Sequence, residues 1–327
     1  MITVIVVTHN RAAMLRECLE SLEAQRSDRP DWRVLVVDNG STDETASLAT
    51  GFCQRLERFS YMFEPKIGAS RARNRGAGEA QTPYLLFVDD ECVFPGDYLD
   101  TAHSIIGRGE PVCFGGPIEP RFWPRPVRPK WFKDAYGAYS MPGTATRQSL
   151  PDLSAGNLGV SRRAFAQVGG FAAAQGPIGR HMNYGEENIL VQALASKFGA
   201  DKVIYEPSFV NRHLVRPEKF KWRTIISENF RRGMARGRLY GLDTRALAPP
   251  VEWSELASST TFASAKESPT KWTRIAASCK DALLDLTFLR RYNNPTAYPH
   301  WQNFVYERWM PYVRWVGIIA GTVTRPR

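Results

Sequence analysis

The feature of this chain that most restricts its fold is a repeated alternation of short apolar runs and amphipathic stretches over residues 1–90. The runs Ile2–Thr8 and Val34–Val37 are rich in β-branched residues and predict buried strands. Between them, Arg11–Ala24 repeats leucines at helical spacing and predicts a helix. The alternation continues with an expected strand, helix and strand at 59–63, 70–80 and 84–88. This order predicts an α/β fold with a mostly parallel sheet flanked by helices.

Polar residues gather where three of these predicted strands end. They form the segments Thr8–Arg11, Asp38–Ser41 and Asp89–Glu91. Each could be ordinary turn chemistry, since Asn, Asp, Gly and Ser favour turns for local reasons. In a parallel sheet, however, these loops leave from one edge and can surround one ligand. Ser41 is also expected to cap a helix that runs towards residue 56, with the following acidic residues in its first turn.

The sequence Asp89-Asp90-Glu91 places three carboxylates directly after the apolar run Tyr84–Val88. Carboxylates after a strand are common in turns and helix caps, so the cluster alone does not define a site. Hard cations such as Mg²⁺ and Mn²⁺ prefer oxygen ligands, and open α/β sheets bind small molecules at this edge. The cluster is therefore a candidate divalent-cation site beside a ligand crevice.

Composition narrows the class of protein. The chain has 327 residues, of which 43% are hydrophobic, so it can bury a substantial core, and we expect one main domain with an extension. Its five cysteines are scattered and lack zinc-like spacing, which favours a reducing cytoplasm. The formal charge of +10 predicts an anionic partner. The chain has no helix-turn-helix or RNA-binding motif, so a phosphate group or an anionic membrane is favoured over nucleic acid as that partner. The apolar N-terminal segment is too short for a signal peptide, and the apolar segment near the C-terminus is too short to span a membrane.

The segment Gly68–Gly76 carries three arginines near an expected helix start, where guanidinium groups suit phosphate oxygens. An exposed, solvated helix face is the alternative. The sequence G-x-x-x-x-G-K-[ST] is absent, and Gly68–Gly76 does not match G-x-G-x-x-G, so the P-loop and dinucleotide-binding interpretations are weak.

The ordered set of motifs resembles the family 2 glycosyltransferases of GT-A fold. The resemblance extends over roughly the first 215 residues and rests on the segments 4–11, 36–43, 72–76 and 87–91. It implies a Rossmann-like GT-A sheet, a nucleotide-diphosphate sugar donor, with a UDP-sugar favoured, and a divalent cation, Mn²⁺ or Mg²⁺.

The resemblance also implies roles for individual residues. Base, ribose and diphosphate contacts fall on Thr8, Asn10, Arg11, Asp38, Arg71, Asn74, Asp89, Asp90 and Asn157. The metal falls on Glu91, with Asp89 nearby. This chain has Glu91 where aspartate is usual in the family, so the metal could shift and Asp90 could contribute instead.

A second acidic pair, Glu186-Glu187, opens an amphipathic segment that ends near Phe198. Acidic residues in a first helical turn ordinarily complement the helix dipole. With the upstream motifs, the pair resembles the family's acidic acceptor-site motif, which implies Glu187 as the catalytic base and Glu186 as the residue that orients the acceptor. The Asp-to-Glu difference leaves their order open. Attack opposite the diphosphate would invert the anomeric configuration.

Two further residues enter through the same resemblance. His213 is expected after a strand at 203–205, where a histidine often completes the metal site, although a lone histidine is more often structural. Asn157 lies in the segment Ser154–Gly159, which resembles a segment that lines the sugar pocket. Small residues there would let the donor approach the backbone.

The rest of the chain is divided by composition. Residues 1–216 are the expected catalytic domain, with a nucleotide-sugar-binding half at 1–116 and an acceptor-binding half at 117–216. Residues 115–150, rich in proline and aromatics, predict a long surface loop, either a lid or a packed connection. Residues 217–327 predict a basic, aromatic-rich helical extension with a Ser- and Thr-rich linker at 251–269. The extension could pack on the catalytic domain or rest on anionic lipid at the inner face of the cytoplasmic membrane.

The function expected from these observations is inverting transfer of a sugar to an acceptor hydroxyl, in surface polysaccharide or glycoconjugate synthesis. A glycan, a lipid-linked or a small-molecule acceptor fits equally. Two other classes stay open: a sugar nucleotidyltransferase, which also needs nucleotide and metal, and a non-catalytic protein that binds polyanions or membranes. The missing Gly-rich basic loop and the Glu186-Glu187 pair count against the first, and the ordered acidic motifs against the second.

Overall fold

The computed structural model describes residues 1–27, 31–122, 128–140, 150–172, 177–178, 181–182, 185–239 and 299–323. The chain divides into two compact units. The first contains the described parts of Met1–Arg125 and Asp134–Val215, and the second those of Pro126–Lys133, Arg216–Gly241 and Thr260–Arg327. The expected linker at 251–269 lies outside the described residues.

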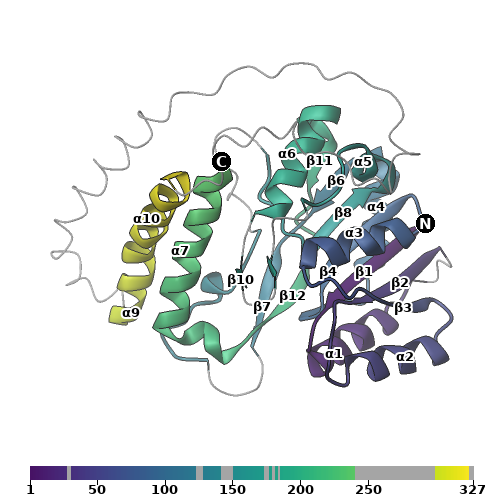
Figure 1. Ribbon diagram of the computed structural model, residues 1–327, viewed down its shortest axis with the longest axis horizontal. Coiled ribbons are helices and arrows are strands. Elements are labelled where there is room, and N and C mark those ends of the chain that lie inside the picture. The colour runs from purple at the N-terminus through teal and green to yellow at the C-terminus, as the bar shows by residue number, and fades with distance from the viewer. Residues whose placement is uncertain are drawn as a thin grey trace. The chain divides into compact units, whose positions relative to one another are not determined.

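The first unit is built on a seven-stranded sheet of order β11-β6-β8-β4-β1-β2-β3 (Figure 1). Its strands are β1 (Ile2–Thr8), β2 (Trp32–Asp38), β3 (Phe59–Phe63), β4 (Tyr84–Asp89), β6 (Cys113–Gly115), β8 (Asn157–Ser161) and β11 (Val203–Tyr205). Strands β1 to β4 run parallel, and β8 lies antiparallel between β4 and β6. The expected mostly parallel α/β sheet is confirmed.

Helices cover both faces of this sheet because successive strand residues point to opposite sides. Val4 and Val6 join a core with α1 and α2, whereas Ile5 packs with α3, α5 and α6 on the other face. The helices are α1 (Ala12–Glu23), α2 (Thr45–Arg55), α3 (Ala69–Glu79), α4 (Tyr98–Gly109), α5 (Arg162–Gln167) and α6 (Glu186–Phe198). Burial on both faces explains why the strands read as continuous apolar runs rather than alternating ones.

Two local expectations were wrong. Ser41 does not cap α2, which begins at Thr45 with no acidic residue in its first turn. Instead, the Asp43 carboxylate accepts from the Thr45 backbone N–H at 3.0 Å. The turn before the helix is longer than expected because Asp43 satisfies the backbone ahead of the first helical turn.

The second wrong expectation concerns residues 115–150, which do not form one continuous loop. Ile118–Phe122 forms strand β7, which pairs with β12 (Asn211–Val215), and β12 also pairs with β5 (Cys92–Val93). Pro120 lies within β7, and β7 is an edge strand of this three-stranded sheet of order β5-β12-β7. An edge strand tolerates proline because one side of its backbone needs no ladder donor. A 3₁₀ turn at Asp134–Tyr136 follows, and residues 123–127 and 141–149 lie outside the described parts.

The smaller elements of the first unit complete its frame. A short hairpin pairs β9 (Pro177–Ile178) with β10 (His181–Met182), and a 3₁₀ turn spans Ala200–Lys202. The expected amphipathic helix that ends near Phe198 and the expected strand at 203–205 are confirmed.

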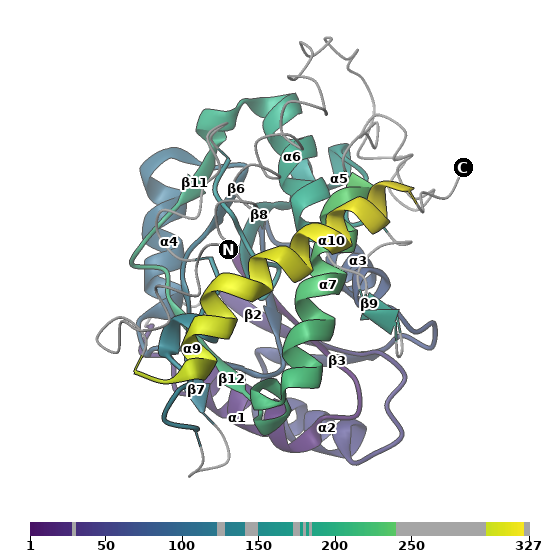
Figure 2. The ribbon, with the colours of Figure 1, turned by 90° about the vertical axis from the view of Figure 1, so that its left-hand side faces the viewer.

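The second unit is helical, as expected for the extension. It contains α7 (Trp222–Leu239), α9 (Trp301–Phe304), a π-helical turn at Val305–Trp309, α10 (Met310–Val323) and a 3₁₀ turn at Pro217–Phe220. Figure 2 shows α10 crossing α7. The two helices meet through four glycines, Gly233 and Gly237 on α7 and Gly317 and Gly321 on α10, where an added Cβ would strike the facing helix backbone. Small residues at this spacing let the two backbones approach closely.

Aromatic side chains join the remaining parts of the second unit. Trp131 stacks on Trp222 with ring centroids 5.3 Å apart, and Trp222 stacks in turn on Trp301 at 5.8 Å. Arg314 of α10 donates to the Asn229 side chain of α7 at 2.6 Å. Among the described residues, no helix combines the length and the apolarity needed to cross a bilayer.

Candidate functional site

The polar segments that end β1, β2 and β4 meet at one edge of the parallel sheet. Thr8 pairs in register with Asp38 on β2, and its neighbour Val7 pairs with Asp89 on β4. Strand β12 of the three-stranded sheet adds His213 through its pairing with Cys92, one residue after the acidic cluster. The fold therefore gathers these side chains at the carboxyl edge of the strands, where open α/β sheets bind ligands.

Asp90 points into the protein and holds the first loop. Its side chain accepts from Thr8 Oγ1 at 2.8 Å and from Arg11 Nη1 at 3.1 Å. Burial raises the pKa of Asp90 to about 6, and the guanidinium of Arg11 opposes that rise. Thr8, Arg11 and Asp90 thus form one hydrogen-bond network at the carboxyl edge of the sheet. Asp90 is almost fully buried.

Glu91 faces β12. Its Oε1 lies 2.6 Å from Nε2 of His213, and its Oε2 lies 3.4 Å from Nη1 of Arg11. The ring of Tyr139 meets the His213 ring edge-on with centroids 5.5 Å apart. Both Glu91 and His213 are largely buried, so their mutual orientation is set by packing.

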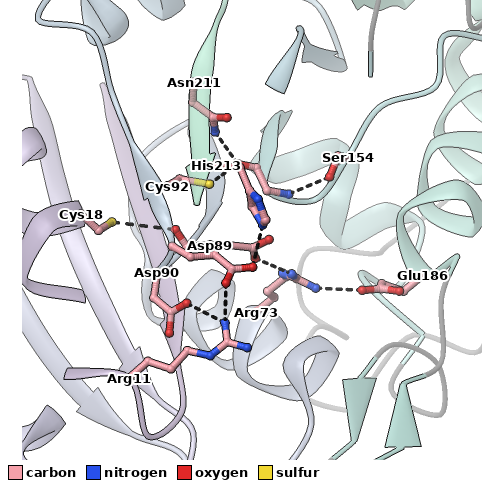
Figure 3. Close-up of polar contacts among 12 residues, drawn as sticks. Arg11, Cys18, Arg73, Asp89, Asp90, Cys92, Ser154, Glu186, Asn211 and His213 are labelled. Atoms are coloured by element: carbon pink, nitrogen blue, oxygen red, sulfur yellow. Dashed lines mark hydrogen bonds and ion pairs between the residues drawn. The ribbon is translucent and has the colours of Figure 1, made fainter. Parts of the chain in front are cut away.

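Arg73 lies between the two acidic motifs (Figure 3). Its Nη2 donates to Oδ1 of Asp89 at 2.9 Å and its Nη1 donates to Oε1 of Glu186 at 3.1 Å. The side chains of Arg73 and Glu186 are each 6% exposed, whereas that of Asp89 is 34% exposed. The first carboxylate of the strand-end cluster is therefore open to a ligand and tied through one guanidinium to the start of α6.

Glu187 follows on the first turn of α6 and is partly exposed. Burial, the negative charge of Glu186 and a hydrogen bond with Glu186 raise the pKa of Glu187 well above its ordinary value, while Arg73 lowers it. A carboxylate with a raised pKa is suited to accept a proton near neutral pH.

On the β2 side, side chains lock the first two loops together. Asp38 is fully buried, and it accepts from the Ser41 backbone N–H at 2.8 Å and from Tyr61 at 3.0 Å. Asn10 accepts from the Thr42 backbone N–H at 2.7 Å and has a left-handed φ of 52°. These two hydrogen bonds, one to each carboxylate oxygen, fix the orientation of the Asp38 side chain.

Two of the expected donor-binding residues, Asn74 and Asn157, have side chains that are hydrogen-bonded inside the protein. The side-chain amide of Asn74 donates from Nδ2 to the Phe171 carbonyl at 2.8 Å, and its Oδ1 accepts from the Phe171 backbone N–H at 2.9 Å. Asn157 is fully buried, where it accepts from Tyr98 and donates to the Phe209 carbonyl. These contacts occupy both side chains inside the protein, while Arg71 is exposed on the first turn of α3.

With this geometry in place, the chain can be compared with known proteins. The model of the family described as "Glycosyl transferase family 2" matches residues 3–169, just over half of the chain. The chain belongs to glycosyl transferase family 2. The resemblance expected from the sequence is confirmed.

Curated relatives of this family 2 chain match over shorter lengths. A validoxylamine A glucosyltransferase of Streptomyces hygroscopicus subsp. jinggangensis is 38% identical over 91 residues, which are 27% of this chain and 21% of that protein. A PGL/p-HBAD biosynthesis glycosyltransferase of Mycobacterium bovis is 36% identical over 113 residues, 34% of this chain and 43% of the relative. The matches thus span about a fifth to two fifths of these relatives' own lengths.

Solved structures show the fold. A mannosyltransferase from Pyrobaculum calidifontis, in complex with GDP-Man and Mn²⁺, superposes with a TM-score of 0.60 at 16% identity and covers 99% of this chain and 87% of its own. GalNAc-T7 with UDP, GalNAc and Mn²⁺ superposes with a TM-score of 0.52 at 15% identity, over 78% of this chain and 53% of its own. The family 2 chain has the expected GT-A fold.

The side chains at the edge fit a divalent cation in part. In the described portion of this family 2 chain, no three His, Cys, Asp or Glu side chains form a group that could hold a metal by themselves. Glu91 and His213 nevertheless offer one oxygen and one imidazole donor side by side, and Nδ1 of His213 is buried without a hydrogen-bond partner in the structure. Two protein donors suit a cation that takes its remaining ligands from phosphate oxygens and water.

Sequence reasoning gave Arg73 only a shared role, as one of three arginines suited to phosphate, and grouped Gly156 with the small residues of Ser154–Gly159; it missed Asn211. An added Cβ at Gly156 would lie 2.8 Å from Oδ2 of Asp89, and Asn211 donates to the Gly156 carbonyl at 2.7 Å. No local pattern marks the approach of Gly156 to Asp89 or the hydrogen bond of Asn211 to Gly156, because each joins residues more than fifty positions apart. Arg73 could have been found as the middle arginine of Arg71-Ala72-Arg73-Asn74-Arg75, on the face of the helix that carries buried alanines.

Proposed function

We propose that this chain transfers a sugar from a nucleoside-diphosphate donor to an acceptor hydroxyl with inversion at the anomeric carbon. The observation that carries the proposal is that Arg73 joins two acidic motifs: Asp89 at the end of β4 and Glu186 at the start of α6. Such a transfer needs one group of residues for the leaving diphosphate and another for the incoming hydroxyl.

The donor side is proposed at the edge formed by β1, β2 and β4. Asp38 and Asn10 would face the base and ribose, with Thr8, Arg11 and Asp90 as the hydrogen-bonded support of that loop. Arg71, exposed at the start of α3, is suited to the phosphates. A UDP-sugar is the favoured donor, and a GDP-sugar is the alternative that the mannosyltransferase complex adds.

Glu91 and His213 would hold Mn²⁺ or Mg²⁺, with Asp89 beside them. A cation at this position would neutralise charge on the diphosphate leaving group. The Mn²⁺ in the two superposed structures and the adjacent Glu91 and His213 donors support this proposal.

The acceptor side is proposed at the start of α6. Glu187 would take the proton of the attacking hydroxyl, and Glu186 would orient the acceptor while held by Arg73. The raised pKa of Glu187 supports this assignment, because a base that retains affinity for a proton near neutral pH removes it more effectively. A glycan, a lipid-linked or a small-molecule acceptor is consistent with the site, and the proposed role is in polysaccharide or glycoconjugate synthesis.

The second unit supports a proposed peripheral contact with an anionic membrane surface. Val316, Ile319 and Val323 of α10 are exposed and recur at the spacing of one helix face, and Trp309 is exposed in the preceding turn. Apolar and aromatic side chains on one face, in a chain of net charge +10, suit the boundary of an anionic bilayer. The proposed location is the inner face of the cytoplasmic membrane.

One assay tests the proposed reaction. The protein is incubated with Mn²⁺ and UDP-glucose, UDP-N-acetylglucosamine or GDP-mannose, and release of the nucleoside diphosphate is measured. We expect slow, metal-dependent donor hydrolysis without acceptor. Pyrophosphate-dependent formation of a nucleoside triphosphate would instead indicate a nucleotidyltransferase. The absence of both turnover and donor binding would indicate a non-catalytic binding protein. Retention of anomeric configuration in the product would refute the inverting mechanism.

A further inference from the structure

We propose that Arg73 is a positioning residue that couples the donor-side carboxylate Asp89 to the acceptor-side carboxylate Glu186. The inference rests on the proposed function and deepens it, because it names the group that holds the two halves of the site at a set separation. Arg73 would touch no reacting atom and would act through the two carboxylates.

The contacts use two different nitrogens of one planar group. Nη2 donates to Asp89 Oδ1 at 2.9 Å and Nη1 donates to Glu186 Oε1 at 3.1 Å. A guanidinium is rigid, so the two carboxylate oxygens are held at a separation that the geometry of the fork defines. A lysine ammonium could supply the charge but has no fork that reaches both oxygens in fixed directions.

The guanidinium itself is held in place. Arg73 is 5% exposed, and its guanidinium carbon lies 5.4 Å from the centre of the Phe171 ring. The next residue of α3, Asn74, binds both backbone groups of Phe171. Helix α3 and the backbone of Phe171 are therefore hydrogen-bonded to each other one residue after Arg73.

The two carboxylates that Arg73 binds differ in solvent exposure. An ion pair that serves only the core would have both partners buried. Asp89 is about one third exposed, whereas Glu186 is buried. Asp89 presents Oδ1 to Arg73, while its Oδ2 lies beside the bare backbone of Gly156. A ligand that engages Asp89 therefore acts on a carboxylate already linked to the acidic pair on α6.

Charge gives the link a further consequence. Asp89, Glu186 and Glu187 all raise the pKa of Arg73, and Arg73 in turn lowers the pKa of Glu187 against burial and the charge of Glu186. The charges of Glu186 and Arg73 thus act on the pKa of Glu187 in opposite directions. Removing the guanidinium would therefore loosen Glu186 and make Glu187 harder to deprotonate.

The catalytic test compares Arg73→Lys and Arg73→Gln with Arg75→Gln, an exposed position on the same helix. The probe is whichever of the three nucleotide sugars named above the unaltered protein turns over fastest with Mn²⁺. We expect Arg73→Gln to lower kcat by roughly 10- to 100-fold with a smaller change in donor KM, and to move the acid limb of the pH profile to higher pH. Arg73→Lys should restore the position of that limb but not kcat, and Arg75→Gln should change neither. Full kcat in Arg73→Gln, or full rescue of kcat by lysine, would overturn the positioning role.

A second readout does not depend on turnover. Thermal unfolding is measured for Arg73→Gln, Glu186→Gln and the double variant. Each single change breaks a buried pair and should lower Tm by roughly 5 °C or more, and the double change should lower it by clearly less than the sum. Additive shifts would refute the link. If Arg73→Gln does not fold, the same cycle with Arg73→Lys replaces it. An unaltered protein that turns over no nucleotide sugar refutes the proposed function and the catalytic coupling, while this cycle still decides whether Arg73 and Glu186 are linked.

Discussion

Nε2 of His213 lies 2.6 Å from Oε1 of Glu91, although 122 residues separate them in the sequence. The contact exists because β12 pairs antiparallel with β5, directly after the acidic cluster. At this distance the two side chains share a hydrogen bond, and because both are largely buried, packing fixes their relative orientation.

The metal proposal predicts the behaviour of Glu91→Gln and His213→Asn. Each change removes one donor, so the Mn²⁺ concentration for half-maximal nucleotide release should rise roughly 10-fold or more. Direct binding of Mn²⁺ in the presence of UDP, followed by electron paramagnetic resonance, should weaken in parallel. Glu119→Gln, at a half-exposed position on β7, serves as the control and should leave both measurements unchanged. Unchanged Mn²⁺ dependence in Glu91→Gln would remove Glu91 from the metal site.

Glu187→Gln tests the base. The amide keeps the shape of the side chain but cannot accept the proton, so kcat should fall by about 100-fold or more. Binding of UDP with Mn²⁺, measured by calorimetry, should stay within a factor of about 2, since the proposed donor contacts lie elsewhere. Asn188→Ala, the exposed neighbour on α6, should retain activity. If Glu186→Gln abolishes turnover while Glu187→Gln does not, the two roles are reversed.

The raised pKa of Glu187 also predicts how stability changes with pH. The folded chain binds this proton more tightly than the unfolded chain, so the stabilisation is fully present below the ordinary value of 4.5 and is lost as pH rises through the raised value. Glu187→Gln should therefore be more stable than the unaltered protein at pH 8, with the difference shrinking towards pH 5. Denaturant unfolding at several pH values measures this. A difference independent of pH would contradict the raised pKa.

Gly156→Ala tests the close approach to Asp89. The new Cβ would lie 2.8 Å from Asp89 Oδ2, while Oδ1 is held by Arg73, so the carboxylate cannot turn away without losing that bond. We expect about 1–3 kcal/mol of destabilisation and a clear loss of kcat/KM. In Gly51→Ala, on α2, the added methyl meets no atom within 4 Å and should stabilise by roughly 0.5–1 kcal/mol. Wild-type kcat/KM in Gly156→Ala would show that Asp89 has room to move.

Sedimentation with vesicles tests the peripheral contact. The double change Val316→Glu and Ile319→Glu places two negative charges on the exposed apolar face of α10. Binding to vesicles of phosphatidylglycerol should fall by roughly 10-fold or more, while binding to neutral phosphatidylcholine vesicles is weak throughout. Ser47→Glu with Ser104→Glu, both at exposed positions of the first unit, matches the change in net charge. Equal loss in the two double variants would show that net charge, not the α10 face, drives binding.

Local sequence was sufficient for the regular elements of the first unit. Ile2–Thr8 and Tyr84–Val88 are apolar along their whole length because parallel strands are buried on both faces, and both became strands close to the expected bounds. The expectations from local sequence were wrong at the start of α2, where the Asp43 side chain binds the backbone, and at β7, where an edge strand accommodates Pro120. Those outcomes depend on which neighbour satisfies or spares a backbone group.

For the site, the residue types and the order of the motifs were readable from the chain, whereas their partners were not. The strand-end position of Asp89 and the helix-start position of Glu186 follow from hydrophobic periodicity, which is a local property of the sequence. That Arg73 joins them, that Asn74 and Asn157 turn inward, and that Glu91 meets His213 depend on contacts between segments from 16 to 122 residues apart. Such contacts arise only when the sheet is assembled, since burial then forces each polar group to find a partner.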